Sequence, residues 1–241
     1  MNNLIDKDDL NARLYKDYIN TYKEKLIISK LKFIQSHKTS GIVPYLLNLI
    51  ELNQKSLSKV EKLLYSLPSS QLNSFYGLEV LSDLKKQKLI VKQLHSKVPL
   101  FKVKDLNANV VDLKTICDSN KLVLLVFWAS WCGPCRNENK ELLSMYSKYH
   151  NLGFEIIAIS CDSKPEPWIG AVTEDGLENW RNVLENQMKY YNSKYTNNGQ
   201  YLIEYLPTKI LVNNKGTIIA RYVGAENNEQ LENAIRISIF N

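Results

Sequence analysis

The N-terminal part of the chain has the hydrophobic period of α-helices. From Asp9 onward, apolar residues recur at intervals of three to five, namely Leu10, Leu14, Tyr18, Tyr22, Leu26, Leu31 and Ile34. Three more stretches repeat this spacing: residues 44–52, which begin with a proline suited to a first helical turn, then 57–67 and 72–84. Residues 1–95 are therefore predicted to form an all-α N-terminal domain.

The pattern changes to strands and helices near residue 96. Strands are expected at 100–103, 110–113, 122–128 and 154–160, and a hairpin at 209–212 and 217–222 with a turn at 213–216. Helices are expected at 115–120, from the paired cysteines to about 149, around 177–188, and at 226–240. The run 122–128 is fully apolar, as is typical of a central strand. Residues 96–241 are therefore predicted to form a layered α/β domain.

Composition and charge narrow the class of protein. The chain has 241 residues, of which 44% are hydrophobic and 23% charged, and it contains no apolar run near the roughly 20 residues that span a bilayer. No signal peptide is visible at its start. Residues 1–95 hold 15 Lys and Arg against 9 Asp and Glu, so the whole net charge of +6 lies there. Solvated helix faces explain this excess, as would a docking face for an acidic partner or membrane; no nucleic-acid motif is present.

The chemistry is expected at Trp131-Cys132-Gly133-Pro134-Cys135, where the central strand meets a helix. A Cys-x-x-Cys in this context indicates thiol–disulfide exchange. The unpaired N–H groups at a helix start favour a thiolate. Cys132 is therefore expected to be the partly exposed nucleophile and Cys135, one turn deeper, the resolving thiol.

Two other uses of a cysteine pair are weaker. Structural zinc needs four ligands, usually two spaced pairs, whereas Cys117 and Cys161 are isolated and the three histidines lack ligand spacing. A bridge across so small a loop restricts the unfolded chain little, so a purely stabilising disulfide is disfavoured. We expect no metal and no organic cofactor, only the redox-active Cys132–Cys135 disulfide.

The order of elements and the stretch from Phe127 to Cys135 resemble the thioredoxin superfamily, and more narrowly the TlpA/ResA-type bacterial thiol–disulfide oxidoreductases. The resemblance covers about residues 97–240 and implies a thioredoxin-like fold, a mixed sheet flanked by helices, preceded by the all-α domain. It implies an extra strand pair near 98–105 and inserted structure at 161–205. One departure is Lys140, which stands where the superfamily commonly has a helix-kinking proline.

The resemblance also implies roles for further residues. Glu138 matches an acidic position of the subgroup: it is either a solvated helix carboxylate or a buried group that shuttles protons to Cys135. Leu206-Pro207 falls at the cis-proline loop, where backbone groups of Leu206 would pair with an extended partner. A substrate-contacting surface would comprise Trp131, Gly133, Pro134, Leu206 and Pro207. Trp128 is expected in the core and Trp131 at the rim.

The resemblance implies an enzyme that reduces protein disulfides in the periplasm or cell envelope and supports cell redox homeostasis. Its partners would be protein dithiol or disulfide clients and an upstream thiol reductant, for which a membrane-associated electron donor is one candidate. Two alternatives stay open: a peroxiredoxin-like (AhpC/TSA) peroxidase, and a non-enzymatic redox-sensitive binding module. Peroxidases of that branch have a Thr or Ser three residues before the reactive cysteine and a proline four residues earlier, where counting back from Cys132 gives Ala129 and Leu125.

Overall fold

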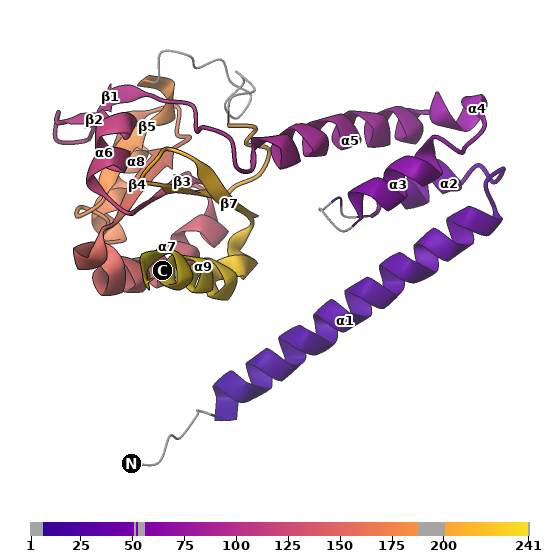
Figure 1. Cartoon of the computed structure of the whole chain (residues 1–241), viewed down its shortest axis with the longest axis horizontal. Helices are drawn as coiled ribbons and strands as arrows, with labels where there is room; N and C mark the ends of the chain where they lie inside the picture. Colours follow the sequence, from indigo (N-terminus) through magenta and orange to yellow (C-terminus); the bar gives the residue numbers. More distant parts are fainter. Residues whose placement is uncertain (1–6, 51, 53–55, 188–200, 241) are drawn as a thin grey trace. The chain divides into compact units, whose positions relative to one another are not determined.

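The computed structural model describes residues 7–50, 52, 56–187 and 201–240 (Figure 1). Its contacts divide the chain into two compact units, residues 1–91 and 92–241. Whether the helical part behaves as an independent domain that ends near residue 95 stays a prediction. Among the described residues, no helix combines the length and the apolar character that crossing a membrane requires.

The first unit is helical, as predicted. Its elements are α1 (Lys7–Ser36), α2 (Val43–Asn48), α3 (Leu57–Leu64), α4 (Ser69–Leu72) and α5 (Phe75–Gln93). Buried aliphatic side chains from these helices form one cluster, which includes Ile34, Leu47, Val60, Leu64 and Val80. The fourth predicted helix differs, because the chain turns between α4 and α5 and α5 then continues to Gln93. Gly77 permits that turn, since a Cβ there would clash with the carbonyl oxygens of Gln71 and Leu72.

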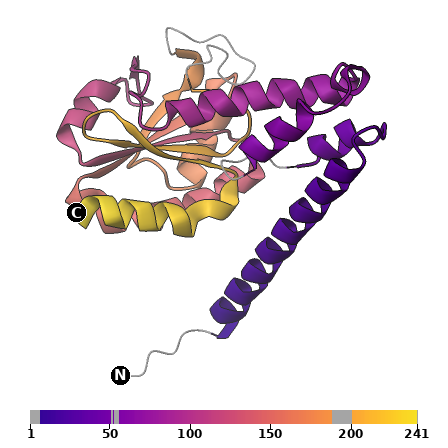
Figure 2. The same cartoon turned by 45° about the vertical axis from the view of Figure 1, so that its right-hand side comes forward.

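The second unit is built on a five-stranded mixed sheet (Figures 1 and 2). The strand order is β5-β4-β3-β6-β7, with bounds β3 Leu122–Trp128, β4 Phe154–Ser160, β5 Arg181–Leu184, β6 Thr208–Asn213 and β7 Ile218–Val223. β4 lies parallel to β3 and β5, whereas β6 is antiparallel to β3 and β7. A separate hairpin joins β1 (Lys102–Lys104) to β2 (Val110–Asp112). The predicted thioredoxin-like fold class is confirmed.

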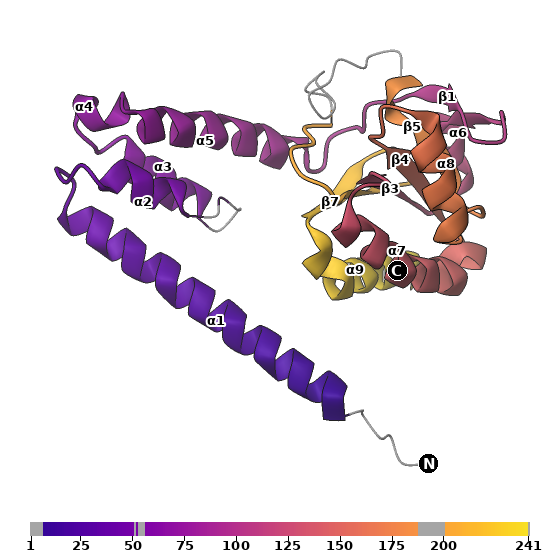
Figure 3. The same ribbon diagram turned by 180° about the vertical axis from the view of Figure 1, so that it is seen from behind.

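Helices cover both faces of the sheet because its central strands are apolar on both sides. Alternate residues of β3, from Leu122 to Trp128, pack in one cluster with α7 (Gly133–Tyr149), α8 (Pro165–Glu174) and α9 (Asn228–Phe240). Figure 3 shows α7 and α9 side by side on that face. The intervening β3 residues pack with α6 (Leu113–Ser119) and the β1–β2 hairpin. Short 3-10 turns complete the unit: η1 (His150–Leu152), η2 (Glu185–Gln187) and η3 (Ala225–Asn227).

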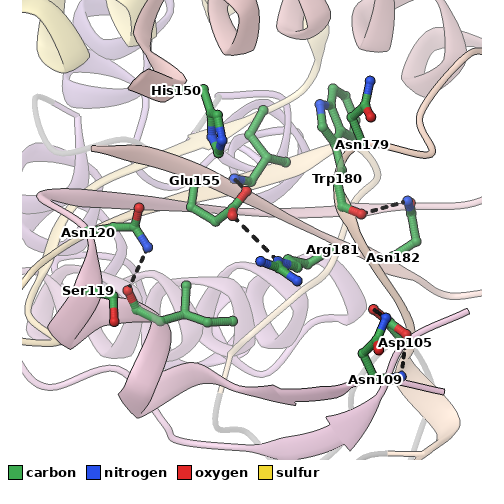
Figure 4. Close-up of polar contacts among 12 residues, drawn as sticks. Asp105, Asn109, Ser119, Asn120, His150, Glu155, Asn179, Trp180, Arg181 and Asn182 are labelled. Atoms are coloured by element: carbon green, nitrogen blue, oxygen red, sulfur yellow. Dashed lines mark hydrogen bonds and ion pairs between the residues drawn. The ribbon is translucent and has the colours of Figure 1, made fainter. Parts of the chain in front are cut away.

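The prediction of a helix around 177–188 is wrong for the described part of that stretch. The helix lies earlier, at α8, where Pro165 occupies the first helical turn and buried Trp168, Ala171 and Val172 have helical spacing. Residues 181–184 form the edge strand β5, which gains backbone hydrogen bonds from β4. Figure 4 shows polar contacts around this edge, including the Arg181–Glu155 ion pair of 3.5 Å and the Asn182 amide that donates to the Trp180 carbonyl.

The segment that follows α5 pairs with the start of β7. The backbone N–H of His95 donates to the carbonyl of Ile218, and the N–H of Ile218 donates to the carbonyl of Ser96. Val98 N–H donates to the Gly216 carbonyl, and Lys97 forms a bridge with Thr217. Residues 95–98 thus supply backbone partners to an edge of the sheet that would otherwise lack them.

Candidate active site

The two cysteines lie at the junction of β3 and α7 and form a disulfide with each other. Cys132 is the N-cap of α7, and its Sγ accepts the backbone N–H of Cys135 at 3.3 Å. Cys132 retains 7% of its exposure and Cys135 only 1%, so the expected order of accessibility holds although Cys132 is more buried than predicted. The sulfur that remains nearer the solvent therefore lies where unpaired backbone N–H groups favour negative charge.

An exposed surface adjoins Cys132. Trp131 is 63% exposed, and Gly133 and Pro134 in the first turn of α7 are also exposed. Trp128, by contrast, is fully buried in the core. The predicted division between a core tryptophan and a rim tryptophan is confirmed. A large apolar side chain that is open to solvent beside a reactive sulfur suits contact with another protein.

A buried aspartate fixes the loop that leads into Cys132. The Asp162 carboxylate accepts the Ser130 backbone N–H at 2.8 Å and the Ser130 hydroxyl at 2.7 Å. It also accepts the Ser160 hydroxyl at 2.7 Å. The sequence carries no local signal for this role of Asp162, because the Ser130 contacts join residues 32 positions apart. These bonds hold the end of β3 to the end of β4, and thereby position the start of α7.

The Leu206–Pro207 peptide bond is cis, as predicted. Pro207 is buried, and Leu206 is half-buried and packs against the cluster that contains both cysteines. The preceding Tyr205 is 68% exposed, and its carbonyl accepts the Thr208 hydroxyl at 2.7 Å. Leu206 therefore packs against the same core cluster as the two cysteines, while its contact with a partner stays a prediction.

Glu138 is buried rather than solvated, so the first of its two interpretations is wrong. Its side chain is 1% exposed and forms an ion pair with Lys209 on β6, whose side chain is 0% exposed. Burial raises the pKa of Glu138 and lowers the pKa of Lys209, because each charged form loses hydration. Sequence reasoning missed Lys209; the available signal was one lysine within the apolar strand 209–212.

Arg136, next to Cys135, ties α7 to the end of α8. Its guanidinium contacts both carboxylate oxygens of Asp175, at 2.7 Å from Nη2 and 2.9 Å from Nε, and Glu174 at 2.8 Å. These hydrogen bonds raise the pKa of Arg136 above its ordinary value. The bidentate geometry restrains the first turn of α7 from the side of α8.

The remaining cysteines are not bonded to each other and lie in different places. Cys117 on α6 is buried in the cluster of the opposite sheet face, whereas Cys161 follows β4 and is half-buried. Burial raises the pKa of the Cys117 thiol to about 11. Within the described ranges, no group of three or more His, Cys, Asp or Glu side chains has an arrangement that could hold a metal ion.

Comparison with known proteins gives a consistent family for the second unit. The AhpC/TSA family matches residues 94–236. A thiol-disulfide oxidoreductase ResA of Bacillus cereus is 31% identical over 141 residues, which cover 58% of this chain and 75% of that protein. ResA of Bacillus anthracis is 30% identical over 144 residues, or 60% of this chain and 78% of that protein.

A solved structure supports the same grouping. It is the crystal structure of a Chlorobium tepidum protein assigned as the thiol:disulfide interchange protein DsbE. The likeness has a TM-score of 0.53 and 26% identity, and it covers 61% of this chain and 97% of that one. Residues 1–93 lie outside the family match.

Proposed function

Because the chain belongs to the AhpC/TSA family, within the thioredoxin superfamily, we propose that it is a thiol–disulfide oxidoreductase that reduces protein disulfides in the cell envelope. One observation carries the proposal: Cys132 and Cys135 form a disulfide at the N-terminus of α7, beside an exposed Trp131. The ResA and DsbE names of its relatives support the same activity.

The reaction follows from the position of the two sulfurs. In the reduced protein, the Cys132 thiolate attacks one sulfur of a client disulfide, forms a mixed disulfide and releases the other client sulfur as a thiolate. Cys135 loses its proton and attacks Cys132 Sγ, which closes the Cys132–Cys135 bridge and releases the second client sulfur. Two electrons pass to the client, and both client thiolates take up protons. An external dithiol reductant must then reopen the bridge.

The clients are proposed to dock on Trp131, Gly133, Pro134, Leu206 and Pro207. Trp131 offers an apolar surface, and Leu206 packs against the core cluster to which Cys132 and Cys135 belong. An extended client segment would pair with the Leu206 backbone by β-augmentation. The Gly133-Pro134 dipeptide matches that of thioredoxin, so we expect a reducing potential nearer the roughly −270 mV of thioredoxin than the roughly −120 mV of DsbA. The envelope location, and an electron donor that is a membrane-associated dithiol, rest on the resemblance to TlpA/ResA-type proteins.

The family match includes peroxidases, but the residues around the cysteines favour the oxidoreductase. Ala129 and Leu125 occupy the positions where a peroxidase of this type has its Thr or Ser and its proline. We therefore expect the reduced protein to reduce insulin disulfides and to consume hydrogen peroxide no faster than a Cys132→Ser variant.

Trapping tests the proposal directly. A Cys135→Ser variant incubated with an envelope extract should accumulate mixed disulfides on Cys132, identified by mass spectrometry. Cys132→Ser should accumulate none, and Cys117→Ser should behave as the wild type. Absence of insulin reduction by the wild type, together with no trapped adduct, would overturn the proposal.

A further inference from the structure

Lys209 is a fully buried lysine inside the sheet of the catalytic unit. It lies on β6 two residues after Pro207, and its backbone pairs with Val126 on the central strand β3. By strand alternation it shares a face with Leu211, which belongs to the cluster that contains Cys132 and Cys135. An unpaired lysine is rarely found at such a depth, so its partners decide what it does.

Each of the three ammonium donors of Lys209 has an acceptor. Nζ forms the ion pair with Glu138 Oε1, and it donates to the Gly224 carbonyl and to Asn228 Oδ1, each at 3.2 Å. The ammonium is thus held by α7, by the loop after β7 and by α9. Glu138 Oε2, by comparison, is buried and has no hydrogen-bond partner among the described residues. One carboxylate oxygen is anchored and the other is left free to receive a proton.

A buried ion pair is a weak device for stability. Removing two charges from water costs about as much as their attraction returns, and apolar residues of similar size often stabilise a core equally well. A group that exchanges protons, in contrast, benefits from such a site. Burial raises the pKa of Glu138 above its ordinary value, which makes its carboxylate a better acceptor for a proton from a thiol.

We propose that Lys209 is a positioning residue that holds Glu138 ready to take the proton from Cys135 when Cys135 attacks the mixed disulfide. Glu138 follows Cys135 by one helical turn, and both side chains are buried on the same side of α7. The inference rests on the proposed function, because Cys135 attacks a mixed disulfide only if Cys132 exchanges with client disulfides.

The proposed step is balanced. The proton moves from Cys135 Sγ to Glu138 Oε2, while Lys209 stays an ammonium and offsets the charge left on the sulfur. The Cys135 thiolate forms the bond to Cys132 Sγ as the bond from Cys132 to the client sulfur breaks. The client sulfur leaves as a thiolate and takes a proton from solvent, and Glu138 later returns its proton to solvent.

Several groups bear on the pH dependence of this step. The charged neighbours of Glu138 are Lys209 on β6 and Glu141 on α7, and the reduced cysteines add two thiols. Asn228 on α9 presents a neutral amide, which also donates to exposed Glu141 at 2.8 Å. Glu141 is common to all the variants below, so its contribution to a pH profile cancels in the comparison.

The test uses the reduced full-length chain and 5,5′-dithiobis(2-nitrobenzoate), which releases one coloured thiolate for each attack. The first phase reports attack by Cys132 and the second reports attack by Cys135. Lys209→Met should slow the second phase about tenfold or more at pH 7 and shift its pH profile, whereas Lys209→Arg should stay within about threefold of the wild type. Lys148→Met is the matched control: Lys148 lies on α7, as Glu138 does, and its exposed ion pair is with Glu232 on α9, so its loss should change neither phase.

The double variant Glu138→Gln/Lys209→Met separates positioning from folding. If the pair only stabilises the fold, the double variant should regain both the melting temperature and the second-phase profile of the wild type, and that result would overturn the proposal. If the pair handles the proton, the double variant regains thermal stability while the second phase stays slow. A wild type that reduces no insulin would refute the proposed function instead, so the two failures are distinguishable.

Discussion

Replacing Asp162 with alanine is expected to destabilise the loop before Cys132. The Asp162 side chain accepts three hydrogen bonds, from the Ser130 backbone N–H, the Ser130 hydroxyl and the Ser160 hydroxyl, at 2.7–2.8 Å. Asp162 is 5% exposed and Ser160 is 0% exposed, so water cannot readily replace the lost acceptor. The substitution would leave buried donors without partners, which is costlier than the loss of an exposed hydrogen bond.

The magnitude follows from those three bonds. Each hydrogen bond to a charged group contributes about 1.5–3 kcal/mol, but half-buried Ser130 can turn its hydroxyl toward solvent, and single substitutions rarely exceed about 4–5 kcal/mol. We expect Asp162→Ala to lower the free energy of unfolding by about 3–4 kcal/mol. Asp162→Asn retains an oxygen for the two donors that meet at Oδ2, and its amide can donate to the Ser130 hydroxyl. It should lose only about 1 kcal/mol.

Urea unfolding of the oxidised chain measures this difference. All four tryptophans, at positions 128, 131, 168 and 180, lie in the second unit (residues 92–241), so tryptophan fluorescence reports on the unfolding of that unit alone. The reasoning is refuted if Asp162→Ala remains within about 1 kcal/mol of the wild type, or if Asp162→Asn loses as much as Asp162→Ala.

Four further outcomes can be checked on the same protein. Iodoacetamide at pH 8 should label reduced Cys132 long before Cys117, whose pKa of about 11 leaves roughly one thiolate in a thousand; equal labelling contradicts this. Because the unfolded Cys117 thiol ionises near pH 9.0, the folded state binds more protons above that pH. Cys117 should therefore contribute a fall in the free energy of unfolding of about 1.4 kcal/mol per pH unit between about pH 9 and 11, measured as the difference in slope between the wild type and Cys117→Ala. Leu142→Ala, in the core face of α7, should cost about 2–5 kcal/mol in urea unfolding, and a loss under about 1 kcal/mol would contradict the packing. Arg136→Lys should cost only about 1 kcal/mol, since Arg136 is 31% exposed, and a loss above about 3 kcal/mol would show that Asp175 depends on it far more than the geometry indicates.

The sequence predicted the central strands well because their physics is local. Residues 122–128 are an uninterrupted apolar run, residues 154–160 are apolar except for Glu155 and Ser160, and the structure places β3 and β4 at those bounds. The helix expected around 177–188 was wrong over its described part, and the helix at Pro165–Glu174 was not predicted, although a proline in the first turn, such as Pro165, is compatible with a helix. The strand β5 is only four residues long and depends on β4 for its hydrogen bonds, which no local pattern reveals.

In the candidate site, too, local features could be predicted from the sequence and long-range contacts could not. Cys132, Cys135 and the nearness of Glu138 follow from spacing along one helix, and the cis bond before Pro207 followed from the family resemblance. The contacts of Lys209 and Asp162 could not be predicted from the sequence. Lys209 contacts α7 from β6, and Asp162, just after β4, contacts the loop before α7. From the sequence alone, a lysine in an apolar strand is predicted to face the solvent. Only the structure shows the buried carboxylate that pairs with it.

The pairing of residues 95–98 with the start of β7 sets a practical limit on how the catalytic unit can be isolated. A shortened chain that begins at residue 99 would lack the hydrogen-bond partners of the Ile218 and Gly216 backbone groups. It would therefore expose a strand edge that is prone to self-association. Recombinant fragments intended for redox assays should therefore start at or before Lys92, where the contacts of the second unit begin.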